Sequence, residues 1–166
     1  PGMPFLEVGN LAGYMLDTKK EEKSVPGSTV ITGIGFISGV RCMVVVDDSG
    51  INAGALMTGG GYRISRSEKI ALEQKLPFVH LVESAGGDLL NYTVEGFSQG
   101  GALFGNLAKL SKEGIPVISI LHGSSTAGGA YMPGLSDYVI AIKGRGRAFL
   151  ALSLIHISEP TRRRGI

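Results

Sequence analysis

Two glycine pairs, each placed directly after a short apolar run, constrain the fold of this chain more than any other feature. Gly86-Gly87 follows the run Phe78–Val82, and Gly128-Gly129 follows the run Val117–Leu121. Both have the same layout: a strand-like run, a tight turn of small residues, and a stretch compatible with a helix. A turn of this kind leaves main-chain N–H groups without intrahelical acceptors, and such groups bind anions or developing oxyanions. The sequence therefore predicts two strand–turn–helix units with anion-binding main chains.

The segment before the first glycine pair predicts a hairpin and a helix. Two strand-like runs, residues 29–37 and 42–46, are separated by a short turn, which is typical of an antiparallel hairpin. We expect residues 47–61 to form a glycine-rich loop. Helical spacing then predicts a helix over about residues 62–76, ended by Pro77. On this helix residues 67–69 are polar, and the apolar positions recur at helical spacing.

The rest of the chain continues the alternation of helices and strands. The spacing predicts a helix over about 96–112 and further strands over 138–142 and 147–150. Short, fully apolar strands that alternate with helices indicate an α/β fold with a mostly parallel sheet and helices over its faces. In such sheets ligands bind at the carboxyl ends of the strands, where both glycine turns are expected.

Composition and charge narrow the class of protein. The net charge of +2 lies in the last residues, Arg162, Arg163, Arg164 and Glu159, so the basic balance indicates no nucleic-acid partner. The single cysteine, Cys42, cannot form an internal disulfide, and we expect it to be a buried apolar residue. The spacing of the cysteine and histidines indicates no metal site. The sequence contains no signal peptide and no apolar run of membrane length, so we expect a cytoplasmic protein with no membrane contact.

Three segments carry a resemblance to a known family: residues 82–88 (VESAGGD), 112–117 (KEGIPV) and 122–138 (HGSSTAGGAYMPGLSDY). They resemble the carboxyltransferase (beta) subunit of biotin-dependent acyl-CoA carboxylases of the propionyl-, methylcrotonyl- and geranyl-CoA type. The resemblance covers roughly residues 25–151. It implies a crotonase-like (ClpP-type) ββα spiral fold, duplicated in two halves, of which this chain holds most of the first.

The resemblance also divides the chain into three parts. Residues 1–24 would be a partial N-terminal segment, and residues 25–151 an incomplete N-domain of the carboxyltransferase. After Ala151 the family continues differently, and residues 152–166 look like the translation of a sequencing adapter, so we expect a non-native tail there.

The implied activity is transfer of a carboxyl group from carboxybiotin to the α-carbon of an acyl-CoA, through a thioester enolate. The resemblance implies a biotin carboxylase/biotin carrier subunit as partner and a homo-oligomer of carboxyltransferase subunits. The main-chain donors that match the family are Gly86, Gly87, Ala127, Gly128 and Gly129, the last three at the start of a helix that adds its dipole. The residues expected at the substrate are Gly59, Gly60, Gly61, Ala85 and Thr126. The first three form either a cradle for a phosphate or CoA, or a mobile loop. We expect the second turn to tolerate no Cβ at Gly128.

The first turn departs from the family. Many members have Ser-Gly-Gly-Ala-Arg, whereas this chain has Ala85-Gly86-Gly87-Asp88-Leu89, which favours branched or longer acyl groups. Two alternatives stay open. One is a crotonase-type enoyl-CoA hydratase or isomerase, which needs an acid/base carboxylate near the second turn, where the sequence offers only Asp137. The other is a truncated chain without activity.

Three sets of polar residues are explained by structural roles more simply than by catalysis or ligand binding. A serine hydrolase built from His122, Ser124 or Ser125 and Asp137 would need a Gly-x-Ser-x-Gly elbow, which the sequence lacks. His80 lies between apolar residues and is predicted to be a core or interface histidine. Residues 47–48 are predicted to be a solvated turn at a strand end.

Overall fold

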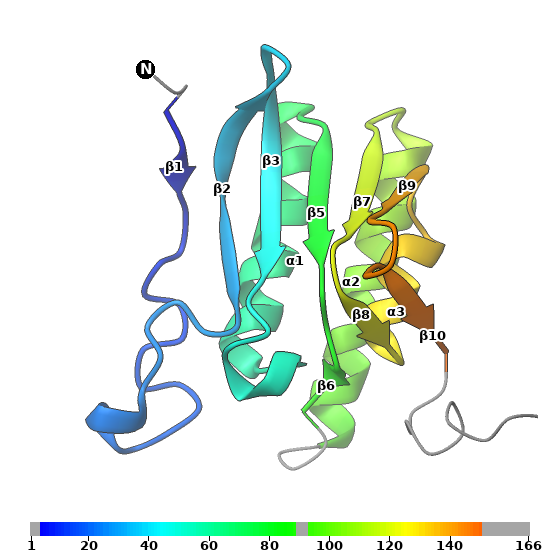
Figure 1. Ribbon diagram of the computed structural model, residues 1–166. Coiled ribbons are helices and arrows are strands. Elements are labelled where there is room, and N and C mark those ends of the chain that lie inside the picture. Colours follow the sequence, from blue (N-terminus) through cyan, green and yellow to red (C-terminus); the bar gives the residue numbers. More distant parts are fainter. Residues whose placement is uncertain (1–3, 89–92, 151–166) are drawn as a thin grey trace, which may run out of the picture.

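The chain forms one main sheet with helices packed behind it (Figure 1). The computed structural model describes residues 4–88 and 93–150. In chain order the elements are β1 (Leu6–Glu7), η1 (Glu21–Lys23), β2 (Val30–Ile37), β3 (Val40–Asp47), η2 (Asn52–Gly54), β4 (Ala55–Leu56), α1 (Thr58–Gln74), β5 (Phe78–Val82), β6 (Gly86–Gly87), α2 (Val94–Lys112), β7 (Val117–Leu121), β8 (Ser124–Thr126), α3 (Gly128–Gly134), β9 (Tyr138–Ala141) and β10 (Arg147–Phe149).

The six-stranded main sheet has the order β1-β2-β3-β5-β7-β9. β2 and β3 form the predicted antiparallel hairpin, in which Ile37 lies opposite Val40. β3, β5, β7 and β9 run parallel to one another, which confirms the mostly parallel sheet. Val82, the last residue of β5, lies opposite Leu121, the last residue of β7. The turns that follow these two strands therefore start at the same edge of the sheet.

The hydrophobic core lies between the sheet and the helices. On β5, Phe78, His80 and Val82 are at most 2% exposed and point to the same face, because every second side chain of a strand does so. Phe78 and Val82 belong to a cluster of buried apolar residues from the sheet and the helices, which also includes Met43, Ile64, Leu103, Leu107 and Leu110. Burial of each large apolar side chain contributes about 1.5–3 kcal/mol, so the cluster holds α1 and α2 against the sheet.

The helix predicted over 62–76 begins four residues earlier, at Thr58, so the predicted loop over 47–61 is wrong for its last residues. Gly59 and Gly60 lie in the first turn of α1, pressed against the N-terminal part of the chain. A Cβ on Gly59 would lie 2.8 Å from the Cα of Gly13, and one on Gly60 would lie 2.5 Å from Oγ1 of Thr29. Glycine at positions 59 and 60 thus allows the start of α1 to pack closely against Gly13 and Thr29. α2 matches the prediction to within two residues, and its first turn is capped by the Thr93 hydroxyl, which accepts from the N–H of Gly96 at 3.0 Å.

Of the polar residues 67–69 on α1, Lys69 is exposed, but Ser67 and Glu68 are each 1% exposed. α1 packs against β2 and β3 and also against α2, and in Figure 1 both helices lie behind the same face of the sheet. A helix enclosed on two sides buries residues that a one-sided helix would expose. Among the described residues, no helix is long and apolar enough to cross a membrane. The predicted tail, residues 152–166, lies outside the described residues.

Two small sheets extend the main sheet beyond the carboxyl ends of β5 and β7 (Figure 1). β4 pairs with β6 in parallel, with Ala55 opposite Gly86. β8 pairs with β10 in parallel, with Ser125 opposite Ala148. The β4–β6 pair therefore fixes the main chain of the first glycine turn, and the β8–β10 pair fixes that of the second.

Candidate functional site

The first glycine turn (residues 83–88) and the second glycine turn (residues 122–129) lie against each other. They follow the carboxyl ends of β5 and β7, which confirms their predicted location. The carbonyl oxygen of Ser84, in the first turn, accepts a hydrogen bond from the N–H of Thr126, in the second, at 2.9 Å. Gly86 has a left-handed φ of 87°. A Cβ built on it would lie 3.2 Å from the carbonyl oxygen of Thr126 and 3.3 Å from the Cβ of Ala127. The first turn therefore needs glycine at this position, because a side chain would press into the second turn.

Ala127 forms a strained elbow between β8 and α3. Its φ of 49° and ψ of −120° lie outside the regions that residues with a Cβ normally adopt. Such a conformation costs about 1–3 kcal/mol and persists where the surrounding structure enforces it. Here the N–H of Ala127 donates to the carbonyl oxygen of Phe149 on β10 at 2.9 Å. In the nucleophile elbow of α/β-hydrolases, a turn with the same strand–elbow–helix layout, the N–H of the residue after the elbow is an oxyanion donor. Gly128 has the corresponding position in this chain.

The main chain of the first turn is hydrogen-bonded on both sides of Gly87, on the far side by the N–H of Asp88, which donates to the carbonyl oxygen of Leu56 at 3.3 Å. The N–H of Ala85 donates to the carbonyl oxygen of Gly54 at 2.8 Å. The N–H of Gly86 donates to the Ser84 hydroxyl at 3.1 Å. These bonds hold the first turn against the η2 segment and fix the direction of its remaining amides.

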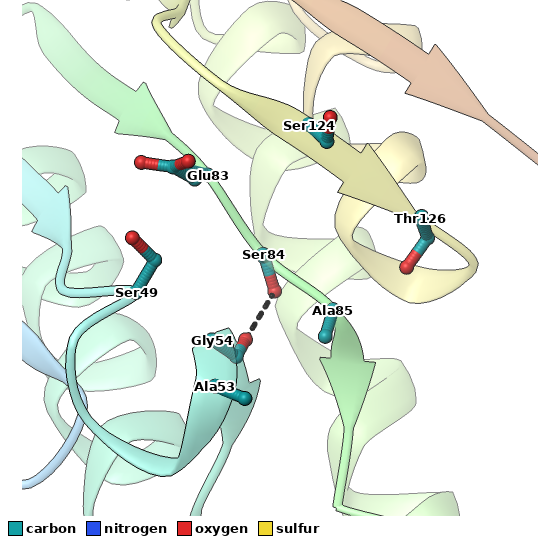
Figure 2. A pocket seen from close by; sticks show the side chains of 8 residues that line it. All are labelled: Ser49, Ala53, Gly54, Glu83, Ser84, Ala85, Ser124 and Thr126. Atoms are coloured by element: carbon teal, nitrogen blue, oxygen red, sulfur yellow. Dashed lines mark hydrogen bonds between the residues drawn. The ribbon is translucent and has the colours of Figure 1, made fainter. Parts of the chain in front are cut away.

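A cavity of about 220 Å³ opens beside the two turns (Figure 2). Its lining comes from Ser49 and residues 53–54, from residues 83–85 of the first turn, and from Ser124 and Thr126 on β8. Two predicted substrate residues, Ala85 and Thr126, are among them. The lining side chains are small apart from Glu83, so the turns are open to a ligand at this point.

The other predicted substrate residues, Gly59, Gly60 and Gly61, do not line this cavity. They form the first turn of α1, where Gly59 and Gly60 are buried against the N-terminal part of the chain. The interpretation of this run as a mobile loop is wrong, because the three glycines form a helical turn. Their role as a cradle for a phosphate or CoA stays a prediction.

Glu83 is a site residue that the sequence analysis missed. It lines the first cavity and also a second, more polar cavity of about 290 Å³ with His122, Gly123, Ser124 and Arg145. Its Oε2 lies 3.4 Å from Nδ1 of His122. A Cβ on Gly123 would fall on the Glu83 carboxylate, so that glycine makes the room for it. The sequence indicated this residue only by its position directly after a buried strand. In parallel α/β sheets, ligand-binding residues follow the carboxyl ends of the strands.

A buried hydrogen bond between Asp47 and His80 supports the start of the first turn. Asp47 Oδ1 lies 3.0 Å from Nε2 of His80, and Asp47 Oδ2 accepts the N–H of Glu83 at 3.2 Å. His80 is 2% exposed, which confirms the prediction of a core histidine. Asp47 is only 8% exposed, so the prediction of a solvated turn is wrong for this residue. The carboxylate is buried because it has two donors, one from a side chain and one from the main chain.

Asp137 lies at the opposite end of the sheet from the second turn. Its carboxylate accepts the N–H of Val117, the first residue of β7, at 2.8 Å, and it also accepts the Ser111 hydroxyl. The second turn follows the other end of β7. Asp137 is therefore a structural cap and not the acid/base group that the alternative activity needs near this turn.

The sequence and the fold both match known proteins. Residues 1–153 match the family of carboxyl transferase domains. The chain is 43% identical over 151 residues to a probable biotin-dependent acyl-coenzyme A carboxylase beta2 subunit of Mycobacterium tuberculosis, covering 91% of this chain and 27% of that protein.

Solved structures agree with this match. The beta subunit of geranyl-CoA carboxylase from P. aeruginosa is 48% identical, with a TM-score of 0.80 over 91% of this chain and 28% of that one. A transcarboxylase 12S structure, described as a hexamer with methylmalonyl-coenzyme A bound, is 26% identical, with a TM-score of 0.71 over 82% of this chain and 27% of that one.

These neighbours confirm the crotonase-like fold. The chain spans about a quarter of the length of these relatives. The match of the family to residues 1–153 and the two converging glycine turns together place this chain in the carboxyl transferase domain family.

Proposed function

We propose that this chain forms the acyl-CoA side of a carboxyltransferase site, at which a carboxyl group is added to the α-carbon of an acyl-CoA. The observation that carries the proposal is the direct contact of the two glycine turns beside an open cavity. Removal of the α-proton of a thioester places negative charge on the carbonyl oxygen. Preorganised N–H groups stabilise such a charge without a charged side chain.

The proposed donors are the N–H groups of Gly87, Gly128 and Gly129. Those of Ala85, Gly86 and Ala127 already donate to acceptors within the chain. We therefore narrow the predicted set of five donors to three and assign Gly86 and Ala127 to the shape of the turns. α3 has only seven residues, so the proposal depends on individual N–H groups at its start and not on its dipole.

The cavity of about 220 Å³ is the proposed place of the thioester and the first carbons of the acyl group. Ala85 and Thr126 line it and would contact the acyl group directly. The small side chains in the lining leave room for a branched or longer chain, in agreement with the geranyl-CoA carboxylase neighbour.

The carboxyl group would come from carboxybiotin on a biotin carrier subunit. The name of the Mycobacterium tuberculosis relative, a beta subunit of a biotin-dependent carboxylase, supports this partner. We also propose that carboxyltransferase subunits associate with one another. The transcarboxylase 12S neighbour, whose structure is described as a hexamer, supports this association.

The test uses a complete subunit that carries this sequence, together with biotin carboxylase and biotin carrier subunits. The mixture contains ATP, labelled bicarbonate and a panel of straight, branched and long acyl-CoAs. We expect acid-stable label in at least one acyl-CoA. Tight binding of acyl-CoAs with no label in any of them would contradict the proposal.

One observation favours a second candidate, an enoyl-CoA hydratase or isomerase. This chemistry needs a carboxylate at the thioester, and Glu83 lines the same cavity as Ala85 and Thr126. Hydration of an enoyl-CoA that is lost in Glu83→Gln would support this alternative. Carboxyl transfer without hydration would exclude it.

A further inference from the structure

Ser84 contacts all three segments that surround the cavity. Its hydroxyl donates to the carbonyl oxygen of Gly54 at 3.3 Å, a bond drawn in Figure 2, and accepts the N–H of Gly86 at 3.1 Å. Its own carbonyl oxygen accepts the N–H of Thr126 at 2.9 Å. One residue thus joins the η2 segment, the first turn and the second turn.

Gly129 approaches Ser84 more closely than any side chain allows. A Cβ on Gly129 would lie 2.8 Å from the Cβ of Ser84 and 3.0 Å from its carbonyl oxygen. The start of α3 therefore rests directly on Ser84. The distance between the first turn and the amides of α3 is set by this contact together with the bond between Ser84 and Thr126.

We propose that Ser84 is a positioning residue that holds the two glycine turns at a fixed spacing, so that their amides act on one oxygen atom. This inference rests on the proposed function. The Ser84 hydroxyl bonds to Gly54 and Gly86, which fixes residue 84 against the η2 segment. The carbonyl oxygen and the Cβ of Ser84 contact Thr126 and Gly129 of the second turn. Loss of the hydroxyl would let residue 84 shift, and its contacts with the second turn would shift with it. Displacement of a catalytic group by about 1 Å costs about 10²-fold in rate, so a clamp between two donor turns has a direct effect on turnover.

The test compares three variants of the complete subunit: Ser84→Ala, Ser84→Cys and Ser67→Ala. Ser67 is a matched control, because it is also buried and its hydroxyl donates to a main-chain carbonyl, that of Arg63, at 2.8 Å, within α1 and away from the cavity. In Ser84→Ala we expect kcat for carboxyl transfer to fall by about 10²-fold with KM little changed. The cysteine keeps a weak donor and acceptor, so Ser84→Cys should recover part of this loss. Ser67→Ala should keep the kcat of the wild type.

Amide hydrogen exchange gives a readout that does not depend on the reaction. In Ser84→Ala we expect faster exchange in peptides that cover residues 83–88 and 124–130, and in Ser67→Ala no change there. If the wild type transfers no carboxyl group but exchange rises in both turns, the proposed function fails and the clamp stands. If the wild type is active and Ser84→Ala keeps its kcat, the clamp is overturned. Loss of kcat in Ser84→Ala without faster exchange in the second turn would also overturn it.

Discussion

Gly86 packs tightly against Ala127, since a Cβ on Gly86 would lie 3.3 Å from the Cβ of Ala127. Both residues have positive φ, 87° and 49°, so two unusual backbone conformations lie in contact. Each turn supports the conformation of the other. All variants are made in complete subunits that carry this sequence.

Gly86→Ala should lower both stability and carboxyl transfer. The left-handed conformation costs a residue with a Cβ about 1–2 kcal/mol, and the new methyl group presses on Thr126 and Ala127. The measurement is the urea midpoint together with kcat. Gly105→Ala is the control, because a Cβ there meets nothing within 4 Å and the site is inside α2, where the change should stabilise by about 0.5–1 kcal/mol. Equal stability of Gly86→Ala and the wild type would refute the prediction.

Gly129→Ala should be far more damaging than Gly128→Ala. A Cβ on Gly129 would lie 2.8 Å from the Cβ of Ser84, whereas one on Gly128 meets only the ring of Phe104, at 3.9 Å. Within the chain the tight position is therefore Gly129, whereas the expectation that the second turn tolerates no Cβ at Gly128 concerns turnover and stays a prediction. Thermal midpoints should fall for Gly129→Ala and stay unchanged for Gly128→Ala. The reverse order would show that the two turns do not pack in this way.

The free energy of unfolding should fall as the pH rises from 4.5 to about 8, because of Glu68. Burial raises the pKa of this carboxyl from 4.5 to about 8, against the lowering effect of the hydrogen bond from Asn106. Above pH 4.5 the unfolded chain releases the Glu68 proton while the folded chain keeps it, so the folded state loses stability as the pH rises to about 8. Glu68→Gln should remove this pH dependence in urea titrations. Glu73→Gln, at an exposed position on the same helix, should keep it.

Arg63→Lys should destabilise the fold by about 3 kcal/mol, since it leaves buried carbonyl groups without donors. The guanidinium donates to the carbonyl oxygens of Gly27 at 2.7 Å and Val30 at 2.6 Å, and it pairs with Glu7 at 3.0 Å. A lysine has a single nitrogen and cannot reach all of these groups. Arg66→Lys, at an exposed position one turn away, should change the urea midpoint little. Similar midpoints for both variants would contradict this account.

The strand–glycine–helix units were predictable because their signals are local. Apolar runs such as Val117–Leu121 and turns such as Gly128-Gly129 define a buried strand and a tight turn wherever they occur. The parallel order of the strands followed from the alternation with helices. The two turns could thus be placed at one edge of the sheet before any contact between them was known.

The polar residues of α1 and the environment of the turns were not predictable in this way. Arg63 is buried because Gly27, Val30 and Glu7 from the N-terminal part of the chain supply its partners. Glu68 is buried against α2, where Asn106 donates to it. Asp47 is buried because His80 and the main chain of Glu83 supply donors from another strand.

The sequence by itself determined the elements, their order and the small residues at both turns, since these depend on neighbours along the chain. The tertiary structure decided which amides remain for a ligand, where Glu83 and Ser84 lie, and which glycine has no room for a side chain. These properties depend on distances between segments remote in sequence, such as Ser84 to Thr126, and only the packing of the sheet against the helices sets those distances.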